Sequence, residues 1–331
     1  MKHVAALAGV GIKTVSRVIN EEPNVAPDTA ARVWEAIRAL DYHLDMQAGS
    51  LRRAGGRTHT LGLLVSSVDN PFASTIHRAV EDSALEHGVA VFASSLDDDP
   101  EREDKAVAAF LRRRVDGLIL TTASPAQNYL SSTAGRGMPV VFVDREPAST
   151  AVDSVVSDNR AGAATATAHL IRHGHRRIAL LTDRLRIQTA AERQRGFFDA
   201  LGAAGIPASE VQVVTDLYDA DGSEAALAGL LASPEPPTAI FSAQNLITIG
   251  VLRALRAAGR ERSVAVVGFD DFPLAGLLDP GVTVVAQDPY RIGRLASERI
   301  FRRLSGEVVE PERVLVPTRL IERGSGELGP S

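Results

Sequence analysis

Four polar side chains near the N-terminus are spaced so that they would share one face of a short helix. They fall at i, i+3, i+4 and i+7 and are Lys13, Ser16, Arg17 and Asn20. Lysine and arginine can donate to guanine edges in the major groove of DNA, and serine or asparagine can bind bases or phosphates. The pattern therefore predicts recognition of a nucleic acid, although an ordinary solvated helix face would look the same taken alone.

A second set of polar residues follows apolar segments that are typical of buried strands. Ser66, Asp144 and Asp270 each come directly after such a segment, and ligands of parallel sheets bind beyond the carboxyl ends of the strands. Carboxylates accept hydrogen bonds from hydroxyls and a guanidinium donates several, so Asp144, Asp270 and Arg193 could clamp a polyol. The alternative, an aspartate that caps the next helix or pairs with arginine, stays open for Asp144 and Asp271.

The polar side chains between Lys13 and Asn20 lie in a region of three short predicted helices, which would pack together around one small core. Gly9–Gly11 is a tight turn between the first two helices, and Pro27 suits the first position of the third. The apolar positions expected inside are Val4, Leu7 and Ala8, then Val15, Val18 and Ile19, then Val33, Ile37 and Leu40.

A different pattern begins at Thr60, after a polar segment that contains Gly49, Gly55 and Gly56. Apolar strand candidates alternate with helical stretches, which is the βαβ pattern of parallel sheets. The strand candidates are 61–65, 89–93, 117–120, 140–143, 178–181, 211–214, 239–241 and 264–267. About 260 residues of such units exceed one core, so two lobes with a cleft between them are expected.

The amino-acid composition excludes several classes of function. The 331 residues include no cysteine, which excludes disulfides, thiolate zinc sites and cysteine nucleophiles. Neither a membrane span nor a secretory signal is found, so we expect a cytoplasmic protein, associated with the nucleoid when bound to DNA. The net charge is −5, yet residues 1–57 carry eight basic against six acidic side chains, a weakly basic N-terminus on an acidic body.

The order of residues in these segments resembles the LacI/GalR family of repressors. In the N-terminal part the resemblance rests on Val4 to Asn20, Val25, Thr29, Val33 and Leu40-Asp41-Tyr42. In the rest of the chain it rests on Leu61-Gly62, Asn70-Pro71-Phe72, Val115 to Ile119, Gly174 to Ile178, Gly268 to Asp271 and Leu320 to Arg323. The resemblance implies a small all-α helix-turn-helix headpiece and a two-lobed, periplasmic-binding-protein-like α/β domain with parallel sheets.

The domains that follow from this resemblance are a headpiece over 1–43, a hinge helix and linker over 44–59, and an effector-binding and dimerisation domain over 60–331. Within the last, the N-lobe would take about 60–156 and 287–314, and the C-lobe about 157–286 and 315–326. The implied protein is a homodimeric transcription regulator, a repressor, that binds a near-palindromic operator in double-stranded DNA and is controlled by a small polar effector, a sugar or sugar derivative.

The resemblance also implies roles for individual residues at the DNA. Ile12, Lys13 and Arg17 fall where the family reads bases, and its phosphate contacts fall on Thr14, Ser16, Asn20 and Thr29. Leu51 matches the hinge-helix leucine that wedges into the minor groove, and its alternative is a linker leucine packed on the headpiece. Gly11 departs from the family's serine cap, and Asp41, Leu44, Asp45 and Gln47, which precede Leu51, depart from the family's residues as well.

In the cleft, the family's effector-binding positions fall on Ser66, Phe72, Asp144, Arg193 and Asp270. Gln244-Asn245 replaces a common asparagine-aspartate pair and leaves the ligand's identity open. We expect no metal and no cofactor beyond the effector, and the familiar catalytic motifs are missing. Two other classes remain, a binding protein without DNA function and an α/β enzyme with an unfamiliar site; binding to an operator would discriminate against both.

Overall fold

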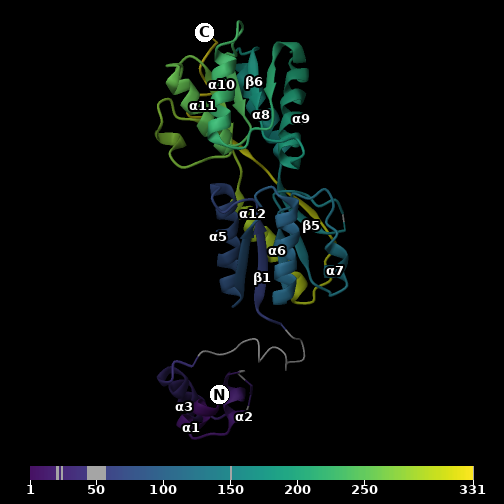
Figure 1. Cartoon of the computed structure of the whole chain (residues 1–331), viewed down its shortest axis with the longest axis vertical. Coiled ribbons are helices and arrows are strands. Elements are labelled where there is room, and N and C mark those ends of the chain that lie inside the picture. Colours follow the sequence, from purple (N-terminus) through teal and green to yellow (C-terminus); the bar gives the residue numbers. More distant parts are fainter. Residues whose placement is uncertain (20–21, 24, 43–56, 150, 331) are drawn as a thin grey trace. The chain divides into compact units, whose positions relative to one another are not determined.

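The chain folds into two compact units in a computed structural model, Met1–Thr58 and His59–Ser331 (Figure 1). The structure describes residues 1–19, 22–23, 25–42, 57–149 and 151–330. The first unit contains the headpiece, and the second is the larger α/β unit.

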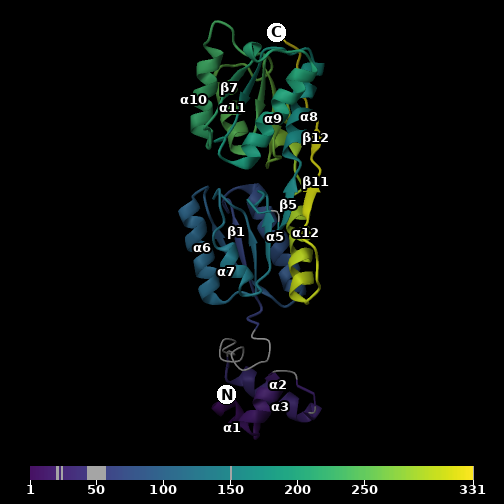
Figure 2. The same ribbon diagram turned by 90° about the vertical axis from the view of Figure 1, so that its right-hand side faces the viewer.

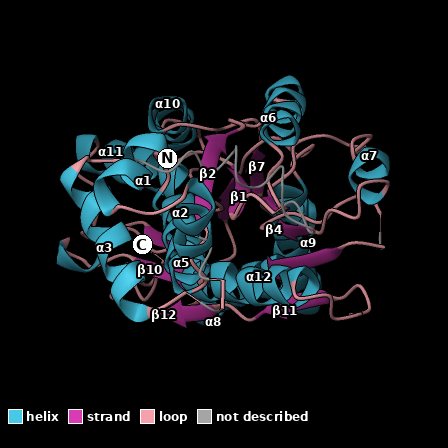
Figure 3. Cartoon of the chain, turned by 90° about the horizontal axis from the view of Figure 1, so that it is seen from below, coloured by secondary structure: helices cyan, strands magenta, loops and turns pink. Residues whose placement is uncertain are grey.

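The described part of the headpiece is entirely helical, with α1 (Lys2–Ala8), α2 (Ile12–Ile19) and α3 (Pro27–Ala39) (Figure 3). Gly9 ends α1 at φ 64°, a left-handed conformation that glycine adopts without steric cost. The buried core consists of Val4, Ala5, Ala8, Val15, Val18, Val33, Ala36 and Ile37.

Two of the apolar residues expected in this core are exposed. Leu7 is 57% exposed, because the buried arc of α1 runs through Val4, Ala5 and Ala8 and leaves Leu7 on its flank. Leu40 is 42% exposed, because it is the C-cap of α3 and its backbone no longer continues the helical stripe. Ala5 and Ala36, which were not predicted, complete the core, and the predicted Ile19 is partly buried.

The first lobe of the α/β unit, the N-lobe, is built on a six-stranded sheet in the order β11-β5-β4-β3-β1-β2. Every neighbouring pair of strands in it is parallel. The strands are β1 (Thr60–Val65), β2 (Ala90–Ser95), β3 (Gly117–Leu120), β4 (Val140–Val143), β5 (Asp153–Ser157) and β11 (Arg313–Val316). One face packs against α5 (Pro71–Glu86) and α12 (Pro289–Leu304), and the other against α6 (Pro100–Arg113) and the short α7 (Leu130–Ala134).

The second lobe, the C-lobe, repeats this plan with the order β12-β10-β9-β8-β6-β7. Its strands are β6 (Ile178–Leu181), β7 (Gln212–Val214), β8 (Ala239–Ser242), β9 (Ala265–Phe269), β10 (Thr283–Ala286) and β12 (Arg319–Ile321), of which β12 is antiparallel. The helices are α8 (Asn159–Arg172) and α9 (Gln188–Ala203) on one face, and α10 (Ala220–Leu231) and α11 (Asn245–Ala257) on the other. Two short 3-10 turns, Ala208–Glu210 and Ala275–Leu277, complete it.

The chain crosses between the lobes after β5, after β10 and after β11. Figure 2 shows β11 leading directly into β12 along one side of the unit. The strands β5 and β11 end at Ser157 and Val316, slightly past the lobe bounds expected at 156 and 314. Three connections on one side leave the opposite side of the cleft open to movement of the lobes.

Candidate functional site

A cavity of about 450 Å³ lies between the lobes, and it brings together all five residues expected to bind an effector. The N-lobe contributes Ser66, Phe72 and Asp144, and the C-lobe contributes Arg193 and Asp270. The carboxyl ends of strands from both sheets face this cavity, as the topology of parallel sheets requires.

The two aspartates of the cavity occupy equivalent places in the two sheets. Asp144 directly follows β4 and Asp270 directly follows β9, and their φ angles are 68° and 73°. Few non-glycine residues adopt this left-handed conformation, and aspartate is among those that tolerate it best. Both side chains are less than a tenth exposed. The backbone strain at the strand ends accompanies two buried carboxylates at the cleft, where such strain is often functional.

Arg193 projects from α9 and is held on several sides. Its Nε donates to Asn159 Oδ1 at 2.8 Å, and its Nη1 donates to the carbonyl of Ala243 at 2.6 Å. Nη1 also lies 3.8 Å from Asp270 Oδ2, and the guanidinium carbon is 3.9 Å from the centre of the Phe269 ring. These contacts fix the guanidinium beside Asp270 before any ligand binds, which is how a preorganised site reduces the entropic cost of binding.

The cavity also holds charged residues that were not predicted from the sequence, among them Asp98, Arg145 and Asp183. Arg145 Nη2 lies 2.7 Å from Asp98 Oδ1, and Arg145 Nε lies 3.6 Å from Asp144 Oδ2. Asp183, two residues past β6, accepts the backbone N–H of Arg184 at 2.6 Å. Burial raises the pKa of the Asp144 and Asp183 carboxyls.

The signals that could have found these residues differ. The strand-end rule, extended by one residue, points to Asp183, because the apolar run ends at Leu181. The sequence Asp97-Asp98-Asp99-Pro100 is typical of a helix start, and Asp99 caps α6 by accepting the N–H of Glu101 at 2.8 Å. Its neighbour Asp98 faces the cavity instead.

Asp271 pairs with an arginine, which was the alternative to ligand binding for an aspartate at a strand end. Its carboxylate pairs with Arg323 through two contacts of 2.7 Å and accepts the N–H of Phe272. The hydrogen bond from Arg323 lowers the pKa of Asp271. Asp271 does not line the 450 Å³ cavity, whereas its neighbour Asp270 does.

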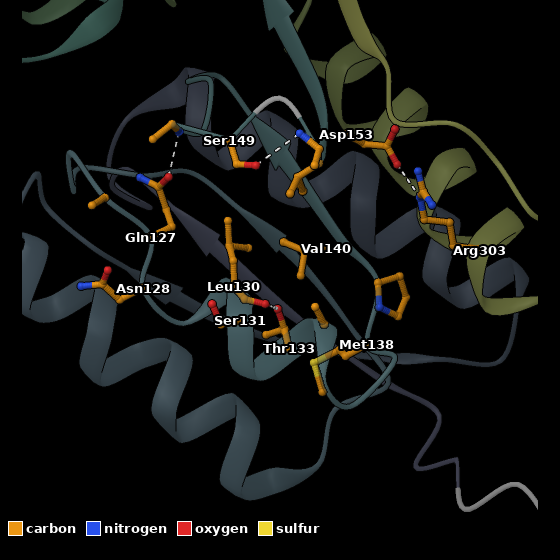
Figure 4. Close-up of a pocket in the computed structure, with 16 residues that line it drawn as sticks. Gln127, Asn128, Leu130, Ser131, Thr133, Met138, Val140, Ser149, Asp153 and Arg303 are labelled. Atoms are coloured by element: carbon orange, nitrogen blue, oxygen red, sulfur yellow. Dashed lines mark hydrogen bonds and ion pairs between the residues drawn. The ribbon is translucent and has the colours of Figure 1, made fainter.

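A larger cavity of about 680 Å³ lies at the edge of the N-lobe and holds none of the expected effector-binding residues. Figure 4 shows Leu130, Ser131 and Thr133 of α7 on one side of it, and the ion pair of Asp153 with Arg303 on another. This cavity lacks the paired carboxylates and buried guanidiniums that converge between the lobes. The interlobe cavity is therefore the candidate effector site.

In the headpiece, the structure places the expected DNA-contacting residues on the outside of α2 and at the start of α3. Ile12, Lys13 and Arg17 are exposed, and Thr14, Ser16 and Thr29 are half-buried. Arg17 Nε lies 3.8 Å from Glu22 Oε2, a solvent-exposed pair. Asn20, Leu51 and the hinge helix expected within 44–59 lie outside the described residues, apart from its last three positions.

Two family models match the chain over nearly its whole length. "Bacterial regulatory proteins, lacI family" matches residues 1–45, and "Periplasmic binding proteins and sugar binding domain of LacI family" matches residues 58–324. The chain belongs to the LacI family. The resemblance found in the sequence is thereby confirmed, and so is the predicted combination of a helix-turn-helix headpiece with a two-lobed α/β domain. As a LacI-family protein the chain is a DNA-binding regulator controlled by a small effector.

Curated relatives match this LacI-family chain from end to end. It is 32% identical to the "Ribose operon repressor" of Escherichia coli (strain K12), over 98% of this chain and 99% of that protein. It is 30% identical to the "HTH-type transcriptional repressor PurR" of Edwardsiella ictaluri (strain 93-146), over 100% of this chain and 97% of that protein. Both relatives are named as repressors.

Solved structures of LacI-family proteins are also similar to this chain. The lac repressor dimer bound to operator and the anti-inducer ONPF superimposes with a TM-score of 0.86 at 27% identity, covering 98% of this chain and 97% of that one. A LacI family regulator from Enterococcus faecium with bound ribose superimposes with a TM-score of 0.74 at 26% sequence identity, covering 80% of this chain and 98% of that one. Among the described residues, no helix is both long and apolar enough to cross a membrane.

Proposed function

We propose that this chain is a transcriptional repressor that binds a near-palindromic operator as a homodimer and changes its DNA affinity when a sugar or sugar derivative enters the interlobe cavity. The observation that carries the proposal is the convergence of Asp144, Arg193 and Asp270 in one buried cavity. Two carboxylates and a preorganised guanidinium provide the paired acceptors and donors that neighbouring hydroxyls require.

The DNA side of the proposal rests on α2. Its exposed stripe offers Lys13 and Arg17 to base edges beside Ile12, while Thr14, Ser16, Asn20 and Thr29 would hold phosphates. Leu51 of each subunit would wedge into the minor groove at the operator centre when two hinge helices meet. Ligand would close the cleft, shift the N-lobes of the dimer and change the distance between the hinges.

Exposed apolar side chains on one edge of the N-lobe support the dimer. Leu85 of α5 is 79% exposed and Phe92 of the edge strand β2 is 43% exposed. Burying such side chains between two subunits would stabilise the pair by about 1.5–3 kcal/mol for each fully buried residue. A second copy of the chain is the partner that the proposal places there.

The proposal assigns the chain no catalytic step, no metal and no cofactor other than the effector. The charged groups of the cavity are carboxylates and arginines, of which Asp98 with Arg145 and Asp270 with Arg193 form ion pairs, and no nucleophile with an adjacent base stands among its described lining residues. We place the protein in the cytoplasm, where operator DNA and imported sugars meet.

The test is fluorescence anisotropy with the full chain and labelled DNA from the region that flanks its own gene, at near-physiological salt. Each titration is repeated with a panel of sugars that begins with D-ribose, the ligand in the Enterococcus faecium structure. Saturable binding that survives competitor DNA and shifts with one sugar is expected. Absence of specific DNA binding, together with retained sugar binding in calorimetry, would leave a ligand-binding protein without DNA function.

A further inference from the structure

Acidic side chains outnumber basic ones around the interlobe cavity. In the described part of the chain, six carboxylates line it against three guanidiniums. The carboxylates are those of Asp69, Asp97, Asp98, Asp144, Asp183 and Asp270, and the guanidiniums are those of Arg145, Arg184 and Arg193. Asp97 pairs with Arg102, which lies outside the lining, and the other five carboxylates still outnumber the three guanidiniums. The surroundings of the ligand are therefore negative even though the cavity contains buried arginines.

The two most buried arginines are already engaged with carboxylates. Arg145 is held by Asp98 at 2.7 Å and lies 3.6 Å from Asp144, and Arg193 lies 3.8 Å from Asp270. No ion pair of Asp183 is found among the described residues, and its side chain is only 8% exposed. An anion placed here would face an unneutralised carboxylate and would compete with aspartates for both guanidiniums.

Some polar side-chain atoms of the described residues that line the cavity have no hydrogen-bond partner. Within the described residues, Gln244 Oε1 and Gln287 Oε1 are buried and accept no hydrogen bond, and Arg145 Nε, on a side chain 8% exposed, donates none. Gln287 Nε2 already donates to Asp270, so its free oxygen can only accept. Among the described lining side chains, the two unpartnered amide oxygens outnumber the one unpartnered N–H. Hydroxyl groups donate, whereas phosphate and carboxylate oxygens of an anion only accept.

We propose that the cavity selects an uncharged polyhydroxylated ligand and rejects its phosphorylated and carboxylated derivatives, with Asp98 and Asp183 as the residues that determine this charge selectivity. The inference rests on the proposed function, because it specifies the ligand class of the same site. Asp98 comes from the loop after β2 of the N-lobe and Asp183 from the loop after β6 of the C-lobe. When the lobes close, a bound anion would therefore lie near one carboxylate from each lobe.

Isothermal titration calorimetry on the full chain tests the proposal with matched pairs of probes. The pairs are D-ribose with D-ribose 5-phosphate, D-glucose with D-glucose 6-phosphate, and D-glucose with D-gluconate. In at least one pair the uncharged member is expected to bind about 100-fold more tightly, because like charges brought together in a buried site cost several kcal/mol.

Two substitutions assign the selectivity to residues. Asp183→Asn keeps an oxygen for the N–H of Arg184, and Asp98→Asn keeps a side chain that tolerates the local φ of 57°. Each is expected to narrow the preference for the uncharged member about tenfold. The control is Asp221→Asn, which removes a carboxylate that is 90% exposed and pairs with Arg253 outside the cavity; it should leave the preference unchanged.

The outcomes separate the two proposals. Tighter binding of a phosphorylated or carboxylated member overturns the charge inference and leaves the proposed function standing. An unchanged preference in both variants overturns the assignment to Asp98 and Asp183. If no member of any pair and no other sugar of the panel binds while the chain still binds its operator, the polyol class is wrong and the sugar part of the proposed function fails with it.

Discussion

The side-chain amides of Asn70 and Asn245 exchange two hydrogen bonds across the cleft. Nδ2 of Asn70 donates to Oδ1 of Asn245 at 3.2 Å, and Nδ2 of Asn245 donates to Oδ1 of Asn70 at 3.0 Å. Asn70 is the N-cap of α5 in the N-lobe, and Asn245 is the first residue of α11 in the C-lobe. The pair ties two helix N-termini together beside the cavity and so favours the arrangement in which the lobes approach each other.

Replacing Asn70 by serine should release this tie and open the cleft. Serine can still cap α5, but it is too short to reach Asn245. Two neutral hydrogen bonds of about 1 kcal/mol each are lost, which shifts the equilibrium toward open lobes by about tenfold or more. Because the chain has no cysteine, labels can be placed on Glu101→Cys and Asp221→Cys, on α6 and α10 opposite the connecting strands (Figure 2).

The distance between these labels, measured by pulsed electron paramagnetic resonance, should increase in Asn70→Ser. The matched control is Asn128→Ser, which alters an asparagine of the cavity at the N-lobe edge. An Asn70→Ser distance equal to that of the wild type would mean that other contacts close the lobes, such as the bond from Glu146 N–H to Gln188.

Substitution of Arg193 should separate ligand binding from DNA binding. Arg193→Lys keeps the charge between Asp144 and Asp270 but loses the planar group that bonds Asn159 and the Ala243 carbonyl. We expect effector affinity to fall at least about 30-fold, since charge-assisted hydrogen bonds contribute about 1.5–3 kcal/mol each. Arg193→Ala should abolish the ligand response altogether. Anisotropy of ligand-free protein on the operator should be unchanged in both, and weaker DNA binding would contradict the site assignment.

Much of the fold was predictable because buried parallel strands are continuous apolar runs. The expected runs 117–120, 140–143 and 178–181 coincide with β3, β4 and β6. The strands β5 and β10 were missed, although both are largely buried, because polar residues such as Asp153 and Thr283 interrupt the apolar pattern. The largely exposed strands β11 and β12 were missed because their apolar runs are short, Val314 to Val316 in β11 and Leu320 with Ile321 in β12.

The site was predictable only where a residue stands at a strand end or matches the family's motif. Asp144 and Asp270 satisfied both conditions, and the structure brings them into one cavity with Arg193. The contact between Asn70 and Asn245 could not be inferred, because 175 residues separate them and their meeting depends on how the lobes close. Sequence patterns specify single elements well and the angle between two lobes poorly.

Glu22 should moderate the DNA affinity of the headpiece. Its carboxylate lies 3.8 Å from Arg17, and both side chains are more than half exposed. Glu22→Gln frees the guanidinium and removes a negative charge near the expected phosphates, so operator affinity should rise a few-fold and most at low salt. Arg17→Ala should weaken specific binding by about 1–3 kcal/mol. Anisotropy across a salt series measures both, and equal affinities in wild type and Glu22→Gln would show that the pair does not restrain Arg17.

Asp153 should make the stability of the α/β unit depend on acidic pH. Its carboxylate is fully buried and accepts hydrogen bonds from Arg299 at 2.6 and 2.9 Å, from Arg303, and from the N–H of Glu312 at 2.9 Å. Burial alone would raise the pKa of Asp153, but the hydrogen bonds from Arg303 and Arg299 outweigh it and lower the pKa. The ionised carboxylate therefore stabilises the folded state more than the unfolded one.

Because the folded pKa lies below the unfolded value of about 3.9, this stabilisation is present above that value and is lost as the pH falls toward the folded pKa. Asp153→Asn should lower the free energy of unfolding at neutral pH by about 3–5 kcal/mol, since it leaves two arginines without their buried partner. Urea denaturation followed by circular dichroism between about pH 7 and pH 3 should show a flatter pH dependence in Asp153→Asn than in the wild type or Asp221→Asn. Parallel curves for all three proteins would show that carboxylates elsewhere control the acid response.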